Sequence, residues 1–184
     1  ALSLFAMTGN FWNPQTVNTP PTPAAPCKEI VGYYPSWQWY DRAQLVNPQT
    51  IDYSKYTVLN YAFFSPQPDG SINSTDAWAD ENLLLGQTDW VNGGYIANTS
   101  LVDLAHNNNV KVLPSIGGFT LSDNFPIIAA SETTRNAFAA ACVTLITTYN
   151  FDGIDLDWEY PGYALHGGSN VDKNNFTLLL QSLR

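Results

Sequence analysis

Short strand-like runs that alternate with helix-period segments restrict the fold of this 184-residue chain more than any other feature. Runs rich in β-branched and aromatic residues cover residues 29–34, 57–64, 110–116 and 151–158. Strand, helix and strand in repetition predict parallel strands joined by right-handed crossovers, with helices covering the sheet. In such α/β folds ligands bind at the carboxyl ends of the strands.

The strongest helical signal covers residues 131–150. Ser131 is placed to cap the N-terminus of this helix, and Glu132 in the first turn suits the positive end of the helix dipole. Apolar residues recur at helical spacing and form one continuous stripe, which consists of Phe138, Ala141, Cys142, Leu145, Ile146 and Tyr149. We therefore expect one long amphipathic helix directly before the last strand-like run.

Two shorter helices follow from the same periodicity. One covers residues 99–106, and the other begins near Asn174. The second carries an apolar stripe of its own, made of Phe176, Leu179, Leu180 and Leu183. Residues 65–97 form a connection rich in Gly, Asn and Asp, for which we expect a helical turn around residues 80–87 and a position over one end of the sheet.

Residues 1–26 are interpreted as an arm or linker, and residues 27–184 as one folded domain. Within the arm, residues 13–26 carry five of the twelve prolines and no charge, as is typical of an extended segment. The whole chain is 45% hydrophobic, which is enough to close one sizeable core.

The charge balance argues against two classes of partner. Only 12% of residues are charged and the formal net charge is −9, so no basic surface is available to attract nucleic acid or an anionic membrane. No apolar run approaches the roughly 20 residues that span a bilayer. We therefore expect neither a nucleic-acid partner nor a membrane partner.

Three Asn-x-Ser/Thr triplets, at Asn73, Asn98 and Asn175, are candidate glycosylation sites. Together with a composition rich in Asn, Thr, Ser and Trp and poor in Lys, they favour a secreted, extracellular protein. In that compartment Cys27 and Cys142 could form one disulfide, and a pair of unlinked buried thiols is an equally open reading. Two cysteines make no metal site, and no cofactor is indicated.

The stretch FDGIDLDWEY, residues 151–160, places four carboxylates among side chains typical of a buried core. In a strand alternate side chains share a face, so Asp155, Asp157 and Glu159 form a row with a spacing of about 6.6 Å, here called the acidic row. Asp152 has the opposite parity and precedes a glycine. A role in fixing the turn that enters the strand is therefore at least as well supported for Asp152 as a catalytic one.

Adjacent buried carboxylates cannot all ionise at neutral pH, so at least one proton is shared and the group titrates as a unit. A shared proton can keep the last member of the row protonated. We interpret Glu159, at the open end of the strand, as a candidate general acid. Asp157 beside it would orient a substrate group or take a proton.

Three other readings of the acidic row stay open. A metal site is one, although the pattern D-x-D-x-E lacks the glycine and the polar intervening residues of a calcium loop, and no His lies nearby. A solvated acidic face is the second, although the interleaved apolar residues indicate burial on the opposite side. Chance clustering in an acidic chain is the third, and the register of the motif argues against it.

The motif resembles the signature DGxDxDxE of family 18 glycoside hydrolases, the chitinases and their relatives, and reads DGIDLDWE over residues 152–159. The resemblance implies a (β/α)8 TIM barrel, of which this chain covers about the first four βα units. It also implies retaining hydrolysis of β-1,4-linked N-acetylglucosamine polymers, in which the 2-acetamido oxygen of the substrate attacks the anomeric carbon. Glu159 would protonate the leaving oxygen and then activate water. Asp157 would hold the acetamido group, with Asp155 sharing the proton behind it.

Two further segments resemble the same family. Ser115, Gly117 and Gly118 match an SxGG motif at the end of the third barrel strand. Residues 31–34 together with Trp37 match its first strand. Both matches occur in the expected order along the chain, so the resemblance extends well beyond the acidic row.

Aromatic side chains would bind the sugar rings, because apolar sugar faces stack on flat side chains. The resemblance implies that Tyr33 and Phe63 line the floor of the −1 subsite and that Tyr160 flanks the acid. Ordinary packing in the barrel interior is an open alternative for Tyr33 and Phe63. Trp37 would serve a subsite or cap the first strand, and Phe119 stands where many members of the family carry Trp.

A barrel of this kind typically needs about 250 residues, whereas the resemblance covers residues 28–184. We therefore expect a fragment: a nicked or truncated product, or one part of an assembly that supplies the missing strands. The predicted function is that of a chitinase acting on chitin or chito-oligosaccharides. The alternatives are a lectin-like relative that binds chitin without cutting it, and a folding or assembly partner with neither activity.

Overall fold

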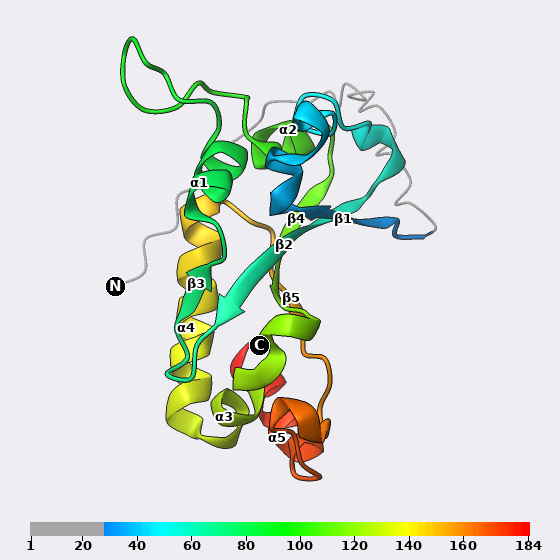
Figure 1. Ribbon diagram of the computed structural model, residues 1–184, viewed down its shortest axis with the longest axis vertical. Coiled ribbons are helices and arrows are strands. Elements are labelled where there is room, and N and C mark those ends of the chain that lie inside the picture. Colours follow the sequence, from blue (N-terminus) through cyan, green and yellow to red (C-terminus); the bar gives the residue numbers. More distant parts are fainter. Residues whose placement is uncertain (1–27) are drawn as a thin grey trace, which may run out of the picture.

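The computed structural model describes residues 28–184, which form an α/β fold on one twisted sheet (Figure 1). The predicted arm, residues 1–26, and Cys27 lie outside the described residues. Neither the arm nor a disulfide that involves Cys27 is therefore tested by the fold.

Four parallel strands form the sheet in the order in which they occur along the chain, β1-β2-β4-β5. They are β1 (Val31–Pro35), β2 (Val58–Pro66), β4 (Lys111–Gly117) and β5 (Asp155–Asp157). A short strand, β3 (Ile72–Ser74), returns antiparallel to β2 and lies alongside α4 (Figure 1). The predicted parallel α/β fold is confirmed.

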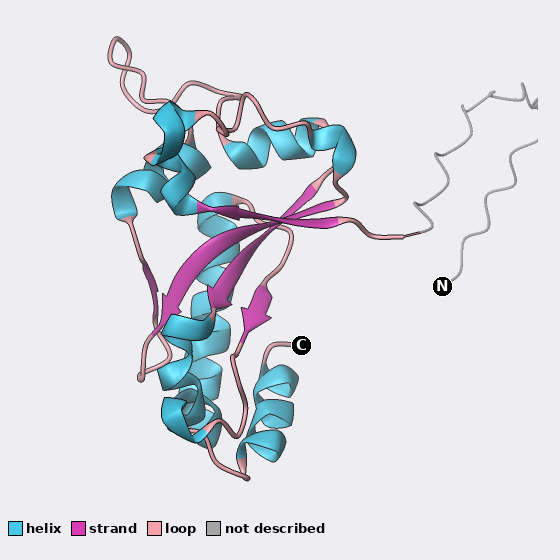
Figure 2. Ribbon diagram, turned by 45° about the vertical axis from the view of Figure 1, so that its right-hand side comes forward, coloured by secondary structure: helices cyan, strands magenta, loops and turns pink. Residues whose placement is uncertain are grey.

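Helices fill the crossovers between these strands, and Figure 2 shows them in relation to the sheet. The α-helices are α1 (Ala77–Asp80), α2 (Leu101–Asn107), α3 (Phe125–Ala130), α4 (Glu132–Tyr149) and α5 (Asp172–Ser182). Shorter turns of helix are η1 (Ser36–Trp39), η2 (Asp41–Gln44), η3 (Tyr53–Lys55), η4 (Glu81–Leu85, a π-turn), η5 (Phe119–Asn124) and η6 (Ala164–His166). None of the helices in the described part of the chain has the length and apolar composition of a membrane span.

The helix predicted over residues 131–150 is α4. Ser131 occupies its N-cap position, but the Ser131 side chain makes no capping hydrogen bond. Instead the hydroxyl of Thr134 donates to the Ser131 carbonyl at 3.0 Å. The helix ends at Asn150, which adopts the left-handed conformation with φ 58°. The predicted apolar stripe faces the core, where Phe138 and Cys142 are buried.

The length of the strand predicted over residues 151–158 is wrong, because only Asp155–Asp157 pair with β4. Before β5, the backbone N–H of Asp152 donates to the Val112 carbonyl at 2.9 Å, and the chain bends. After β5, the backbone N–H of Glu159 donates to a side-chain oxygen, Ser122 Oγ, instead of continuing the ladder. At the first end the Asp152 carboxylate also accepts from the Val112 backbone N–H, so a side-chain oxygen takes part at each end of the short strand.

The connection over residues 65–97 contains the predicted helical turn, now α1 followed by η4, and also the unpredicted strand β3. The turn into β3 is closed by Asp69, whose carboxylate accepts from the Ser71 backbone N–H at 2.9 Å. Gly70 at the tip has φ 89° and packs against α4. An Asp-Gly pair is typical of such a turn, so a local sequence signal for this hairpin is present.

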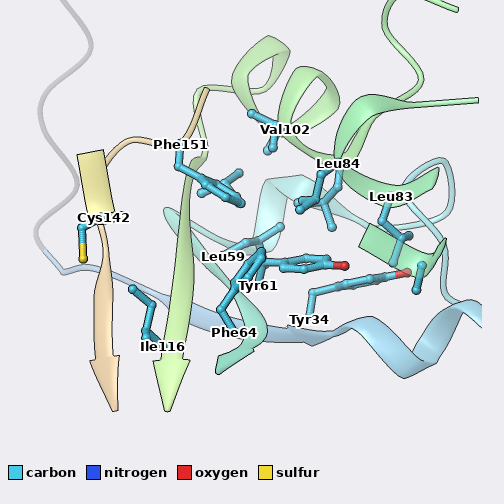
Figure 3. Packing of buried hydrophobic residues seen from close by; sticks show 14 of the residues in the cluster. Tyr34, Leu59, Tyr61, Phe64, Leu83, Leu84, Val102, Ile116, Cys142 and Phe151 are labelled. Carbon is cyan, nitrogen blue, oxygen red and sulfur yellow. The ribbon is translucent and has the colours of Figure 1, made fainter. Parts of the chain in front are cut away.

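The core lies between the sheet and the helices (Figure 3). Tyr61 and Phe64 project from β2 into its centre and are buried almost completely. The Tyr61 hydroxyl donates to Oδ1 of the buried Asp80 carboxylate at 2.6 Å, which gives the buried hydroxyl a partner in an apolar setting. The opposite face of the sheet is left to the polar and aromatic residues of the site.

Candidate active site

The acidic row lies at the C-terminal end of β5, next to β4. Ser115 and Gly117 of β4 stand opposite Asp155 and Asp157 of β5 in the parallel register. The residue between the last two acids, Trp158, points the other way and is only 6% exposed. The alternation predicted from the sequence therefore separates an acidic face of β5 from an apolar one.

Asp155 is held by two hydroxyl groups from neighbouring strands. Its Oδ2 accepts a hydrogen bond from Ser115 Oγ at 2.7 Å and another from the Tyr33 hydroxyl at 3.0 Å. Two hydrogen bonds to one carboxylate fix its orientation. Tyr33 and Ser115 therefore make Asp155 the anchored member of the row.

Asp157 is the member of the row with the strongest electrostatic perturbation. Partial burial, then the charges of Glu159 and Asp155, and a hydrogen bond with Glu159 raise the pKa of Asp157 to about 6. The sequence argument placed the shared proton on Glu159, the last member, whereas the raised pKa is found at the middle member. The charge of Glu159 and the hydrogen bond with it therefore couple Asp157 to Glu159.

Glu159 is positioned by Ser122, a residue that the sequence reasoning missed. The Glu159 backbone N–H donates to Ser122 Oγ at 2.8 Å, and Ser122 Oγ in turn donates to the Gly118 carbonyl at 2.9 Å. The neighbouring Tyr160 forms a hydrogen bond with the Glu159 carboxylate, which raises the pKa of the Tyr160 phenol. Ser122 belongs to no motif and meets Glu159 only in the folded chain, so no local signal identifies it.

The two glycines of the SxGG motif allow β4 and β5 to approach closely. Gly117 and Gly118 have φ values of 109° and 89°, which disfavour any side chain. A Cβ at Gly117 would collide with the Asp157 carbonyl. The Gly118 N–H donates to that same carbonyl at 2.7 Å. The glycines therefore set the backbone position of Asp157.

Three of the predicted aromatic residues form one cluster beside the row. The ring of Phe63 lies 6.4 Å from Tyr33 and 6.3 Å from Trp37, measured between ring centroids. Phe63 follows Ala62 at a register shift in β2, and Gly118 leaves room for its ring. Tyr33 and Trp37 are 55% and 53% exposed, so two of the three rings present a surface to solvent.

A second aromatic cluster lies on the other side of the acid and contains two further predicted residues, Tyr160 and Phe119. Tyr160 meets Tyr163 edge to face at 6.3 Å. The ring of His166 lies 4.8 Å from Phe119 and 5.2 Å from Tyr163. The sequence reasoning missed Tyr163 and His166, which lie in the loop that follows the motif.

Asp152 lies at the opposite end of β5 and is not part of the acidic row. Its carboxylate accepts from the Val112 backbone N–H at 2.8 Å and contacts His106 Nε2 at 2.8 Å. These contacts agree with the turn-fixing role considered for this residue. Within residues 28–184, no three His, Cys, Asp or Glu side chains converge as metal ligands would.

Comparison with known proteins identifies the family. The family model for "Glycosyl hydrolases family 18" matches residues 29–184. The chain belongs to glycosyl hydrolase family 18. Chitinase A1 of Niallia circulans is 37% identical over 88% of this chain and 28% of its own length. Chitinase 1 of Aphanocladium album is 36% identical over 83% of this chain and 35% of its own length.

Solved structures agree with this family assignment. Chitinase ChiA74 from Bacillus thuringiensis superposes with a TM-score of 0.68 at 34% identity, over 84% of this chain and 32% of that chain. The Group IV chitinase of Ostrinia furnacalis, in a complex with allosamidin, gives a TM-score of 0.71 at 28% identity, over 85% of this chain and 40% of that chain. These neighbours are TIM barrels, so the predicted fold class is confirmed, with this chain as part of the barrel.

The family 18 chain spans about a third of the length of the curated relatives that it matches. Its β1 and β5 are therefore the edges of an open sheet, and each has a described neighbour on one side only. The acidic row, Ser115 and both aromatic clusters nevertheless come from the strands and loops that the chain contains.

The candidate glycosylation sites and Cys142 lie away from the row. Asn73 and Asn98 are exposed, and Asn175 is partly buried on α5. The Asn98 side chain accepts a hydrogen bond from Asn107. Cys142 is buried in α4, and burial raises the pKa of its thiol to about 12. The disulfide with Cys27 stays a prediction.

Proposed function

We propose that this chain carries the catalytic carboxylates of a chitinase, which hydrolyses β-1,4-linked N-acetylglucosamine polymers with retention of configuration. The observation that supports this most directly is Asp157, whose pKa is raised to about 6 between two other carboxyls at the carboxyl end of β5. Relatives that carry the name chitinase add support. Chitin or chito-oligosaccharides are the proposed substrates, and no cofactor or metal is proposed.

Glu159 acts first as an acid and then as a base. Protonated Glu159 gives its proton to the leaving glycosidic oxygen while the acetamido oxygen of the −1 sugar attacks the anomeric carbon. Asp157 shares a hydrogen bond with Glu159 and faces the acetamido group, so it stabilises the charge that develops on either partner. Ionised Glu159 then takes a proton from the water that opens the cyclic intermediate.

Asp155 supports this step through its own hydrogen bonds. Its charge raises the pKa of Asp157, and the hydroxyls of Tyr33 and Ser115 keep its carboxylate oriented. The cluster of Tyr33, Phe63 and Trp37 offers flat surfaces for the sugar at the −1 position and beyond. Tyr160 and Phe119 flank the acid on the other side.

The remaining barrel strands are proposed to pair with β1 and β5, whichever polypeptide carries them, since both strands lie at the edges of the sheet. Secretion and glycosylation at the Asn-x-Ser/Thr triplets are proposed from the sequence. Exposure of Asn73 and Asn98 supports glycosylation at these two positions.

The test supplies the missing strands from a relative of known structure. In a chimera, residues 29–184 replace the matched segment of chitinase ChiA74 from Bacillus thuringiensis, and cleavage of a soluble N-acetylglucosamine oligomer is followed beside the 184-residue chain alone. We expect the chimera to cleave, and Glu159→Gln to lower turnover about 10³-fold while binding of the oligomer persists.

Circular dichroism and thermal unfolding serve as the control that both proteins are folded. A folded chimera that cleaves no faster than its Glu159→Gln variant would contradict the proposal. If that same protein binds the oligomer, the lectin-like alternative takes its place.

A further inference from the structure

His166 connects two loops that enclose the acid. It belongs to η6, in the loop after β5, and its ring packs against Phe119, the first residue of η5 in the loop after β4. Its Nδ1 lies 3.1 Å from the Asp123 carboxylate, within ion-pair distance although not in line for a hydrogen bond. The His166 side chain is only 13% exposed, whereas Asp123 is 70% exposed. The imidazole is thus the buried partner of the contact.

The loop that presents His166 has a fixed base. Asp172, 1% exposed, accepts hydrogen bonds from the backbone N–H groups of Gly162 and Ser169, both at 2.9 Å. Gly168 lies so close to the backbone of Tyr163 that a Cβ there would collide with it. Because both ends of the loop are held, His166 has little freedom to leave Phe119 and Asp123.

The contacts of His166 close a ring around Glu159. On one side, the ring of Tyr163 packs against both His166 and Tyr160, and Tyr160 is hydrogen-bonded to the Glu159 carboxylate. On the other side, η5 carries both Asp123, which contacts His166, and Ser122, which holds the Glu159 backbone. A shift of either loop would therefore move the acid.

We infer that His166 is a positioning residue for Glu159: its ring and its contact with Asp123 hold the loops after β4 and β5 together and so fix the acid. The catalytic meaning of this inference rests on the proposed hydrolysis. The contact between the two loops does not depend on the proposed hydrolysis. The loop contact and its effect on catalysis are therefore tested separately.

The structural test measures amide hydrogen exchange at Glu159 in the 184-residue chain. His166→Ala should speed exchange of the Glu159 amide about fivefold, because it removes both the ring packing and the contact with Asp123. His166→Phe keeps a ring against Phe119 and should restore part of the protection, and Asp123→Asn should lose part of it. Leu165→Ala is the matched control, since Leu165 lies in the same turn and is 82% exposed.

The kinetic test uses the chimera. His166→Ala should lower kcat about tenfold with KM nearly unchanged, because a misplaced acid slows the chemical step more than it weakens binding. His166→Phe should recover part of kcat. A general loss of stability would instead affect Leu165→Ala or KM as well.

Unchanged Glu159 exchange in both His166→Ala and Asp123→Asn would overturn the inference, whatever the activity. An equal change in Leu165→Ala would overturn it too. If exchange responds as expected but the folded chimera does not cleave, the loop contact stands and the proposed hydrolysis fails.

Discussion

Asp152 and Asp157 stand five positions apart in one ten-residue motif, and their surroundings are opposite. Asp152, at the entry of β5, contacts a backbone N–H and an imidazole. Asp157, at the exit, faces two other carboxyls, and every cause that acts on its pKa raises it. The same type of side chain thus contacts the backbone at one end of β5 and has a raised pKa at the other.

The groups that surround a carboxylate, rather than the number of carboxylates in the motif, therefore separate a structural acid from a catalytic one. A carboxylate that accepts hydrogen bonds from N–H groups holds the backbone in place. A partly buried carboxylate that lies among other carboxylates has a raised pKa. It can therefore carry a proton at a pH where general acid catalysis operates. Substitutions at one end of β5 should therefore have effects that substitutions at the other end lack.

The largest effect on stability is expected at the exit of β5. Gly117→Ala should lower the free energy of unfolding by about 3 kcal/mol or more, because the new Cβ collides with the Asp157 carbonyl at a backbone φ of 109°. Gly93→Ala is the control, since Gly93 also has a positive φ of 80° but nothing within 4 Å. Urea unfolding should show a loss of only about 1 kcal/mol for Gly93→Ala. Equal losses in the two variants would mean that the close approach of β4 and β5 is unimportant.

A smaller effect is expected at the entry. Asp152→Ala should cost about 2 kcal/mol, because the Val112 N–H loses a charged acceptor. Asp41→Ala removes a carboxylate whose ion pair with Arg42 is exposed, and it should cost less than about 1 kcal/mol. Chemical denaturation of both variants checks the difference. If Asp152→Ala lowers the free energy of unfolding no more than Asp41→Ala does, the structural role of Asp152 is contradicted.

The smallest effect is the pH dependence contributed by Asp157. Its pKa is about 6 in the fold, above the ordinary 3.8, so the folded chain keeps this proton to higher pH than the unfolded chain. The stabilisation by the protonated form is complete below about pH 4 and is lost as the pH rises through about 6. Asp157→Asn should remove this decline, whereas Asp152→Asn should leave it. Unfolding curves across this window, with each variant subtracted from the wild type, give the result, and an identical decline in Asp157→Asn would contradict the assignment.

Much of the framework could be predicted from periodicity. The order of strands and helices, the stripe on α4 and the alternation of acids on β5 all depend on local patterns with periods of 3.6 and 2. The position of the row at the carboxyl end of β5 followed from the parallel topology. Tyr33, Phe63 and Ser115 were reached through their family motifs.

The remaining features depend on contacts between residues far apart in sequence. β5 ends early because the Glu159 N–H donates a hydrogen bond to Ser122 Oγ, which lies 37 positions away in the sequence. His166 approaches Asp123 and Phe119 only because the loops after β4 and β5 meet. The raised pKa of Asp157 reflects burial and two neighbouring charges, those of Glu159 and Asp155, together. The periodicity of apolar residues in one sequence does not predict such long-range contacts.

The division of the motif is tested by comparing Asp157→Asn with Asp152→Asn in the chimera. Turnover of a soluble N-acetylglucosamine oligomer and the free energy of unfolding are measured for both variants. We expect Asp157→Asn to lose at least about 100-fold in turnover with stability unchanged or higher at neutral pH, and Asp152→Asn to lose stability and keep most of its turnover. The reverse pattern, or equal losses of turnover in two folded variants, would contradict the division of the motif into a structural end and a chemical end.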